Sequence, residues 1–367
     1  MKDPPMITIR IPSLLANVLL AIFSILIALI LLEIGSSIWL NHFASPEDYR
    51  RYALYSQMDP SLFRWTGHPY LDYYPSPNYH SEGTYHNSLG YRNEEFPVAK
   101  PAGTYRIVAL GGSSTYTEKV KENEKTFTAQ LEKILQQQYH YANVQVINAG
   151  VPAYTTWESL VNLEFRVLDL EPDLIIIYHN TNDVTARLVK PEAYRGDNSG
   201  ARKQWSPPPI PWWEHSTLLR ILSRKLDWTD QVRLRDFVEA PTTLNRSGGD
   251  RYAALQQNRP IYFERNLRNM IAVARENGVS VMLATWAYAP GFGDYADKDY
   301  YQQAFAEQND IIRRLGESHQ VPVFDFAAVM PQEKQYWADG RHVNEQGARL
   351  KAELFAQFLD QNGLLPR

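Results

Sequence analysis

Short apolar runs alternate with longer amphipathic segments through most of the chain. The short runs have the length and the β-branched content of buried strands, and the longer segments repeat apolar residues at helical spacing. The predicted strands are 105–110, 144–148, 173–178, 279–285 and 321–326. The predicted helices are 124–138, 156–168, 264–276, 301–318 and 344–361. Strands that alternate with helices predict an α/β domain with three layers, α/β/α, around a parallel sheet.

A different pattern stands near the N-terminus. The segment from Leu14 to Leu32 carries no charged residue, and beyond Glu33 the apolar stretch continues to Leu40. About 27 helical residues reach roughly 40 Å, which is enough to cross a ~30 Å hydrocarbon core with some tilt. We therefore expect one transmembrane anchor at 13–40. The run is longer than the apolar region of a signal peptide and no small-x-small site follows it directly, which favours an uncleaved anchor over a cleaved signal.

The charges around this run predict its orientation. Lys2 and Arg10 precede it, Trp39 lies at its far end, and the flank beyond is of mixed charge. The positive-inside rule therefore favours a single-pass protein with a cytoplasmic N-terminus and an extracytoplasmic domain, periplasmic or on the cell surface. Glu33 lies near the outer end of the run, so we interpret it as an interfacial carboxylate rather than a functional acid within the membrane.

Three further segments are predicted from composition. Residues 41–104, rich in aromatics and Pro, read as a tether that packs on the main domain at 105–367. An insertion at about 186–260 breaks the strand–helix rhythm. Its Pro- and Trp-rich part, 204–213, could be a stiff polyproline piece, a lid or a loop packed by its own aromatics. The basic amphipathic pattern at 218–226 fits a membrane-surface helix, although a plain surface helix is favoured.

Composition excludes several classes of protein. The formal net charge of −4 argues against a nucleic-acid partner. The absence of cysteine excludes disulfides and thiolate metal sites. The histidines never fall in a ligand-spaced pair, and no glycine pattern fits a phosphate loop. We therefore expect neither a metal nor a cofactor.

The candidate chemistry begins where the first predicted strand ends. Val108-Ala-Leu-Gly-Gly-Ser-Ser-Thr115 carries a strand into a glycine turn that exposes Ser113. Open α/β sheets bind ligands at this end of their strands. Far downstream stands Asp339-Gly-Arg-His342. A serine, a histidine base and an orienting carboxylate are the parts of an acyl-transfer site.

Two more predicted strands end in groups that can donate hydrogen bonds. Asn-Ala-Gly150 follows one of them, and His179-Asn-Thr-Asn182-Asp follows the next. A backbone N–H at Gly150 and the side-chain amide of Asn182 are both usable donors to an oxyanion.

The order Ser, Gly, Asn and Asp-x-x-His resembles the SGNH (GDSL-type) hydrolase family. The resemblance implies a flavodoxin-like SGNH hydrolase fold with Ser113 as nucleophile, His342 as base and Asp339 as its orienter. It also implies an oxyanion hole made by the N–H groups of Ser113 and Gly150 and by Asn182.

Two positions depart from the family pattern. Gly112 stands where the family usually has Asp before the serine, and Asn180 stands where it usually has Gly. The upstream run His86-Asn-Ser-Leu-Gly-Tyr-Arg92 resembles a leader seen in a membrane-anchored or exported branch of the superfamily.

The expected function is that of an extracytoplasmic, membrane-anchored serine esterase. Its expected partners are an acylated carbohydrate, O-acetylated above all, of a surface or secreted glycan, the membrane through the N-terminal helix, and envelope or polysaccharide-export proteins. The alternatives are an O-acyltransferase that passes an acetyl group to a polysaccharide, a lipase or thioesterase, and a non-enzymatic assembly subunit that keeps the fold.

Overall fold

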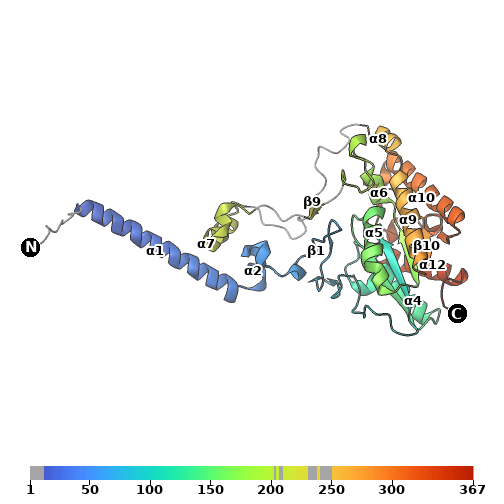
Figure 1. Cartoon of the computed structure of the whole chain (residues 1–367), viewed down its shortest axis with the longest axis horizontal. Helices are drawn as coiled ribbons and strands as arrows, with labels where there is room; N and C mark the ends of the chain where they lie inside the picture. Colours follow the sequence, from blue (N-terminus) through green and yellow to red (C-terminus); the bar gives the residue numbers. More distant parts are fainter. Residues whose placement is uncertain (1–11, 202–203, 206–209, 230–237, 240–249, 367) are drawn as a thin grey trace, which may run out of the picture. The chain divides into compact units, whose positions relative to one another are not determined.

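The computed structural model describes residues 12–201, 204–205, 210–229, 238–239 and 250–366 (Figure 1). The chain divides into two compact units. One unit comprises Met1–Asp59 with Pro207–Arg233, and the other comprises Pro60–Ser206 with Leu234–Arg367. We call them the anchor unit and the α/β unit. Lys2 and Arg10, on which the predicted orientation rests, lie outside the described residues.

A five-stranded parallel sheet forms the centre of the α/β unit. The strands are β5 (Tyr105–Gly111), β6 (Val144–Gly150), β7 (Leu174–Tyr178), β10 (Ser280–Ala284) and β11 (Val323–Phe324). Their order in the sheet is β11-β10-β7-β5-β6, and every neighbouring pair is parallel. The register pairs Gly111 with both Gly150 and Tyr178. Three strands therefore end level, and the turns that follow them share one edge of the sheet.

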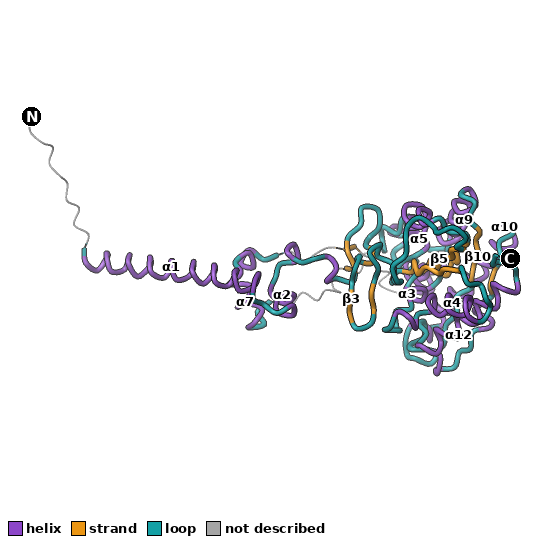
Figure 2. The backbone as a smooth tube through the Cα atoms, turned by 90° about the horizontal axis from the view of Figure 1, so that it is seen from below, coloured by secondary structure: helices purple, strands orange, loops and turns teal. Residues whose placement is uncertain are grey.

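Helices cover both faces of this sheet, as Figure 2 shows around β5 and β10. One face packs against α4 (Phe127–Gln137) and α12 (Glu345–Gln361), and the other packs against α9 (Ile261–Glu276) and the later part of α10 (Asp299–His319). Successive residues of β5 alternate between the two cores: Ile107 and Ala109 face one, and Val108 and Leu110 face the other. This alternation follows from the side-chain period of two in a strand, and burial of both faces explains why the strands are apolar throughout.

The prediction of three layers, α/β/α, is confirmed. All five predicted strands and all five predicted helices are present. The helix predicted at 156–168 begins as expected but is α-helical only over α5 (Thr156–Asn162), and a π-helical turn, Leu163–Val167, continues it. Among the described residues the sequence analysis did not predict the short helices α2 (Pro46–Tyr52), α3 (Ser113–Tyr116), α6 (Thr181–Ala186), α8 (Arg251–Gln257) and α11 (Phe326–Val329). It also did not predict the two-residue strands β1 (Trp65–Thr66), β2 (Tyr74–Pro75), β3 (His80–Ser81), β4 (Thr84–Tyr85), β8 (Gln204–Trp205) and β9 (Val238–Glu239).

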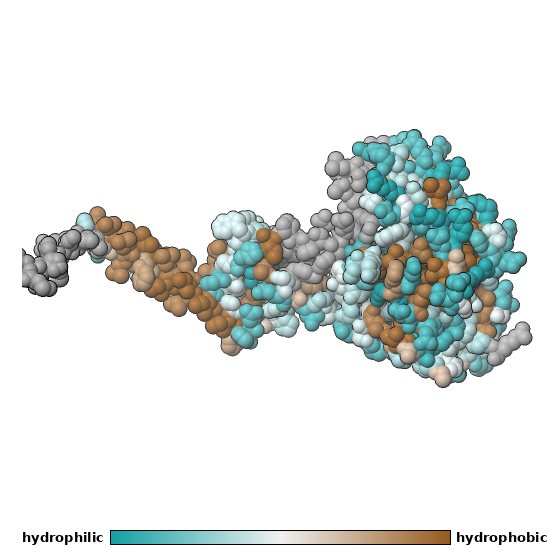
Figure 3. Space-filling view, viewed as in Figure 1, coloured by the Kyte–Doolittle hydropathy of each residue, from teal (hydrophilic) through white to brown (hydrophobic). Residues whose placement is uncertain are grey.

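The anchor unit contains the one described helix that is long and apolar enough to cross a membrane, α1 (Ser13–His42). Figure 3 shows it as a continuous apolar surface. Two shorter helices, α2 (Pro46–Tyr52) and α7 (Thr217–Lys225), complete this unit. The predicted tether at 41–104 is thus divided, with its first part in the anchor unit and the rest, from Pro60, in the α/β unit.

Candidate active site

Ser113 stands on a turn that only glycine allows. It is the first residue of α3, directly after β5. A Cβ at Gly111 would lie 2.0 Å from Thr115 Oγ1, and a Cβ at Gly112 would lie 2.5 Å from Asn182 Nδ2. The two glycines therefore let α3 fold back on its strand and let the Asn182 amide approach the serine's turn. The close approach of Asn182 explains why a glycine stands at position 112, where the family usually has Asp.

The structure brings Ser113, His342 and Asp339 together in a hydrogen-bonded chain. Ser113 Oγ lies 2.7 Å from His342 Nε2, and His342 Nδ1 lies 2.9 Å from each Asp339 carboxylate oxygen. Burial alone would raise the pKa of Asp339. Two influences outweigh this effect of burial: the hydrogen bond and charge of His342, and the backbone N–H groups of Arg341 and His342. Together they hold the pKa of Asp339 at about 2. Asp339 is thus ionised and keeps the Nδ1 proton of the imidazole, which leaves Nε2 free to accept the serine's proton.

The proposed oxyanion donors differ in what they already bind. Asn182 donates from Nδ2 to the Tyr154 carbonyl at 2.7 Å. An amide nitrogen has two protons, so a second donor remains. The N–H of Gly150 already donates to Asn148 Oδ1 at 3.1 Å, and Tyr116 N lies 2.4 Å from where a Cβ of Gly150 would be. Gly150 therefore packs against the back of α3, and the structure does not offer the free N–H that its predicted role requires.

A residue that the sequence analysis missed offers such a group. Ala153 lies in the left-handed region, with φ of 67°, on the turn after β6. Within the part of the chain that the structure describes, the backbone N–H groups of Ala153 and Ser113 have no hydrogen-bond partner. Ala153 also borders the same pocket as Asn182. A left-handed residue without glycine's freedom gives no recognisable signal in a single sequence, which is why the residue was missed.

The run His86–Arg92 contacts the end of α3, the helix that begins with Ser113. Arg92 is buried and donates to the carbonyls of Tyr116 and Thr117, each at 3.0 Å, where α3 ends. His86 Nδ1 lies 3.0 Å from the Ser76 carbonyl, so this nitrogen carries the proton and Nε2 accepts from the Tyr116 hydroxyl at 2.7 Å. Burial lowers the pKa of His86 to about 3. The upstream motif is thus part of the support of the nucleophile's helix.

Lys351 of α12 supports the same turn from the other side. Its ammonium nitrogen is buried, lies 3.9 Å from the ring centroid of Tyr178 and donates to the Ser114 carbonyl at 3.2 Å. Burial lowers the pKa of this lysine well below its ordinary value. At helical spacing a lysine ordinarily indicates a solvated face, so the sequence pattern concealed this contact.

His179 is buried and borders a small cavity beside Ser113. It lies 2.7 Å from Ser159 Oγ, and burial lowers its pKa to about 3. Asp183, next to Asn182, accepts from the backbone and hydroxyl of Thr156. Burial raises the pKa of Asp183 to about 7, despite these bonds. Both residues fix the turns that follow β6 and β7.

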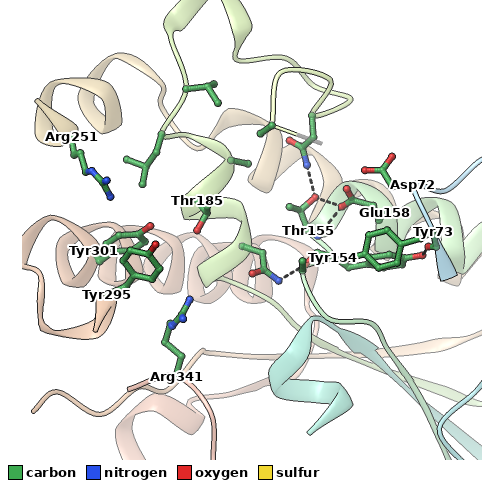
Figure 4. A pocket seen from close by; sticks show the side chains of 17 residues that line it. Asp72, Tyr73, Tyr154, Thr155, Glu158, Thr185, Arg251, Tyr295, Tyr301 and Arg341 are labelled. Carbon is green, nitrogen blue, oxygen red and sulfur yellow. Dashed lines mark hydrogen bonds between the residues drawn. The ribbon is translucent and has the colours of Figure 1, made fainter. Parts of the chain in front are cut away.

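A pocket of about 450 Å³ lies beside Asn182. Its wall includes Arg341, which directly precedes His342 in the sequence. Figure 4 shows the side chains of Arg251, Tyr295, Tyr301 and Arg341 gathered at one end of it. Asp72, Tyr73 and Glu158 line the other end in the same view. The pocket is therefore walled largely by groups that hydrogen-bond or stack on a ring.

The arrangement can perform acyl transfer through a serine. A hydroxyl, an imidazole and an ionised carboxylate are in contact, and uncommitted N–H donors lie on neighbouring turns. Among the described residues no group of His, Asp and Glu side chains could hold a metal ion.

Comparison with known sequences identifies the family to which the chain is similar. The sequence model of the GDSL-like lipase/acylhydrolase family matches residues 109–350. No curated protein matches the chain. Similar solved structures include a lipase/acylhydrolase from Enterococcus faecalis, at 21% identity and a TM-score of 0.44, over 72% of this chain and 98% of that one. Another is a catalytic mutant of an acetylxylan esterase from Geobacillus stearothermophilus, at 13% identity and a TM-score of 0.43, over 71% and 96%.

Proposed function

Because the chain belongs to the GDSL-like lipase/acylhydrolase family and is a carboxylic ester hydrolase, we propose that it cleaves acyl esters of a glycan through Ser113, His342 and Asp339. The observation that carries this proposal is the unbroken hydrogen-bonded chain from Ser113 Oγ through both nitrogens of His342 to the Asp339 carboxylate.

Acylation follows from this geometry. Ser113 Oγ attacks the ester carbonyl carbon while His342 Nε2 takes the hydroxyl proton. Negative charge develops on the carbonyl oxygen, where the N–H groups of Ser113 and Ala153 and the amide of Asn182 stabilise it; each such donor is worth roughly 3–4 kcal/mol. The C–O bond then breaks, and His342 returns the proton to the leaving sugar hydroxyl. Asp339 stabilises the imidazolium between these two steps.

Deacylation reuses the same groups. His342 takes a proton from water, the hydroxide attacks the acyl-serine, and the carboxylic acid leaves as Ser113 recovers its proton. If a sugar hydroxyl takes the place of water, the acyl group passes to a second glycan. The transferase reaction therefore needs no further catalytic residue, only an acceptor that outcompetes water.

The pocket favours a sugar over a long acyl chain. The hydroxyl of Tyr295 and the guanidinium group of Arg341 are suited to a polyhydroxylated ring. A long-chain lipase needs a groove lined by long aliphatic side chains, and Leu188 and Val189 are the only such side chains larger than alanine among the residues that line this pocket.

We also propose that α1 holds the enzyme at a membrane with its catalytic unit outside the cytoplasm. The length of α1 and its exposed apolar side chains support the crossing. The direction rests on Lys2 and Arg10 before it. A partner in the cell envelope or in polysaccharide export would suit that location.

The test is incubation of the full-length protein with an O-acetylated oligosaccharide, with and without an unacetylated acceptor, followed by mass spectrometry. The proposal expects acetate release from the wild type and none from Ser113→Ala. Acetylated acceptor would identify the transferase. In a parallel series of p-nitrophenyl esters, acetate should exceed octanoate by at least about tenfold in kcat/KM. A preference for octanoate would identify a lipase or thioesterase instead, and no turnover of any ester would contradict the proposal.

A further inference from the structure

The helix α7 has its polar side inward and its apolar side outward. Leu219, Leu222 and Leu226 recur at helical spacing on one face and are 43%, 41% and 54% exposed. Arg220 and Arg224, on the opposite face, are only 1% and 5% exposed. A surface helix in water buries the first kind of face and exposes the second. The exposed side of α7 is therefore better suited to apolar surroundings than to water.

Both arginines of the buried polar face are bonded within the anchor unit. Arg220 Nε donates to the Tyr52 carbonyl at 2.6 Å, at the end of α2. Arg224 donates to the Arg51 carbonyl at 2.8 Å and pairs with the Glu214 carboxylate at 2.6 Å. These bonds fix which face of α7 points outward.

Glu33 of α1 caps the first turn of α7. Its carboxylate accepts from Ser216 Oγ at 2.6 Å and from the N–H groups of Thr217 at 2.7 Å and Leu218 at 3.0 Å. The next free N–H, that of Leu219, donates to Ser216 Oγ at 3.2 Å. The N–H groups that a helix leaves open at its start are thus satisfied by the protein. Hydrocarbon requires this of every backbone group within it, whereas water does not.

The position of Glu33 along α1 agrees with this setting. Glu33 stands nineteen positions after Leu14 along the helix, a rise of roughly 28 Å, which is close to the thickness of a ~30 Å hydrocarbon core. The start of α7 is therefore fixed at the level where a membrane crossed by α1 would end. Figures 1 and 2 both show α7 beside the C-terminal part of α1.

Aromatic side chains extend the outer face at both ends of α7. Trp212 precedes the helix and is 78% exposed, and Trp228 follows it and is 75% exposed. Tryptophan at such exposure is typical of the boundary between acyl chains and headgroups. Together with Leu219, Leu222 and Leu226 they form what we call the outer face of α7.

We propose that the outer face of α7 lies in the outer leaflet of the membrane, as a second lipid contact docked on α1 through Glu33. The partner is the acyl-chain and headgroup boundary of a bilayer. The inference rests on the proposed membrane anchoring by α1 and is independent of the chemistry proposed for Ser113.

The native chain has no cysteine, so a single introduced cysteine reports from one place only. Full-length protein carrying Leu222→Cys with a nitroxide label is placed in phosphatidylcholine–phosphatidylglycerol nanodiscs. Its relative accessibility to oxygen and to a water-soluble nickel chelate is then measured. Leu26→Cys, on the exposed side of α1, serves as the lipid reference, and Gln357→Cys, exposed on α12, serves as the water reference.

The expected result is that the label at Leu222 resembles the one at Leu26. Adding Glu33→Ala should shift it toward the label at Gln357, whereas Ser24→Ala, elsewhere on α1, should not. Near-ultraviolet circular dichroism of the Glu33→Ala protein shows that its α/β unit remains folded.

Three outcomes would overturn the proposal. A Leu222 label that resembles Gln357, while Leu26 stays lipid-like, would place α7 in water. A water-like label at Leu26 would remove the anchoring itself. Dipolar broadening between Leu222 labels that disappears on dilution with unlabelled protein would identify the outer face as a contact between copies. None of these outcomes depends on catalysis, so failure here and failure at Ser113 are distinguishable.

Discussion

The helices α12 and α7 have similar amphipathic patterns and bury opposite faces. In α12 the apolar residues Ala348, Phe355 and Leu359 are inside, and the polar ones lie largely outside. In α7 the arginines are inside and the leucines are outside. The comparison teaches that amphipathic spacing predicts a helix with two faces, whereas contacts outside the helix decide which face is turned inward. The helix α12 follows the rule for a helix in water, and α7 departs from it.

The largest expected effect is a loss of activity in the α/β unit that leaves the anchor unit unchanged. Ser113→Ala should lower ester hydrolysis by about 10⁶, because the nucleophile is removed while its partners stay in place. The same protein should remain in the membrane fraction, since the anchor unit is untouched. Initial rates measure the loss of hydrolysis, and resistance to carbonate extraction measures retention in the membrane fraction. Retained hydrolysis would transfer the nucleophile's role to another residue.

The next effect concerns the base. Asp339→Asn should lower kcat by up to roughly 10⁴, because an amide does not hold the Nδ1 proton of His342 as an ionised carboxylate does. The fold should persist, which near-ultraviolet circular dichroism monitors. Lys119 approaches the same carboxylate at 3.9 Å from a half-exposed position, so Lys119→Ala is the matched control and should change the rate little. Equal rates for Asp339→Asn and the wild type would show that other contacts orient His342.

The inverted face of α7 offers a test of stability. Arg224→Ala leaves the Glu214 carboxylate buried without its cation, a change that typically costs about 3–5 kcal/mol. Lys225→Ala, at the neighbouring exposed position, should stay within about 0.5 kcal/mol. Hydrogen exchange of the α7 amides in detergent measures both. Equal protection in the two variants would mean that the arginine face does not hold α7.

A smaller effect appears on acidification of the α/β unit. Burial lowers the pKa of His86 to about 3, whereas an unfolded histidine titrates near about 6.5. Between these values only the unfolded chain binds the proton, so this histidine makes stability fall as pH decreases from about 6.5 toward 3. From about pH 7.5 to about pH 4.5 the wild type should lose roughly 2.7 kcal/mol more than His86→Gln. Urea unfolding at both pH values gives this difference, and parallel losses would refute the buried neutral state.

Much of this architecture could be predicted from the sequence. The five strands were found because burial on both sides makes each one an apolar run. The residues Ser113, Asn182, Asp339 and His342 could be singled out as candidates because each stands near a strand end or in a short motif. Ala153 was missed because its left-handed backbone leaves no mark on residue identity. The supporting contacts of Lys351 and Arg92 were missed because only the tertiary structure shows that these basic side chains are buried beside the turn of Ser113.

The orientation of α7 also could not be predicted from local sequence. Its spacing correctly indicates an amphipathic helix, but the plain surface helix favoured from sequence would turn its leucines inward. The bonds of Arg220 and Arg224 fix this orientation together with the contact of Ser216 with Glu33, which lies 183 residues away along the chain. No local pattern could have indicated a partner at that distance.

The central claim, that Ser113 is a nucleophile activated by His342, is tested most directly by covalent labelling. Full-length protein is treated with a fluorophosphonate, digested and analysed by mass spectrometry, beside Ser113→Ala and His342→Ala. We expect one adduct, on the peptide that carries Ser113, strongly reduced in His342→Ala and absent from Ser113→Ala. An adduct on another serine, together with retained ester hydrolysis in Ser113→Ala, would contradict the claim.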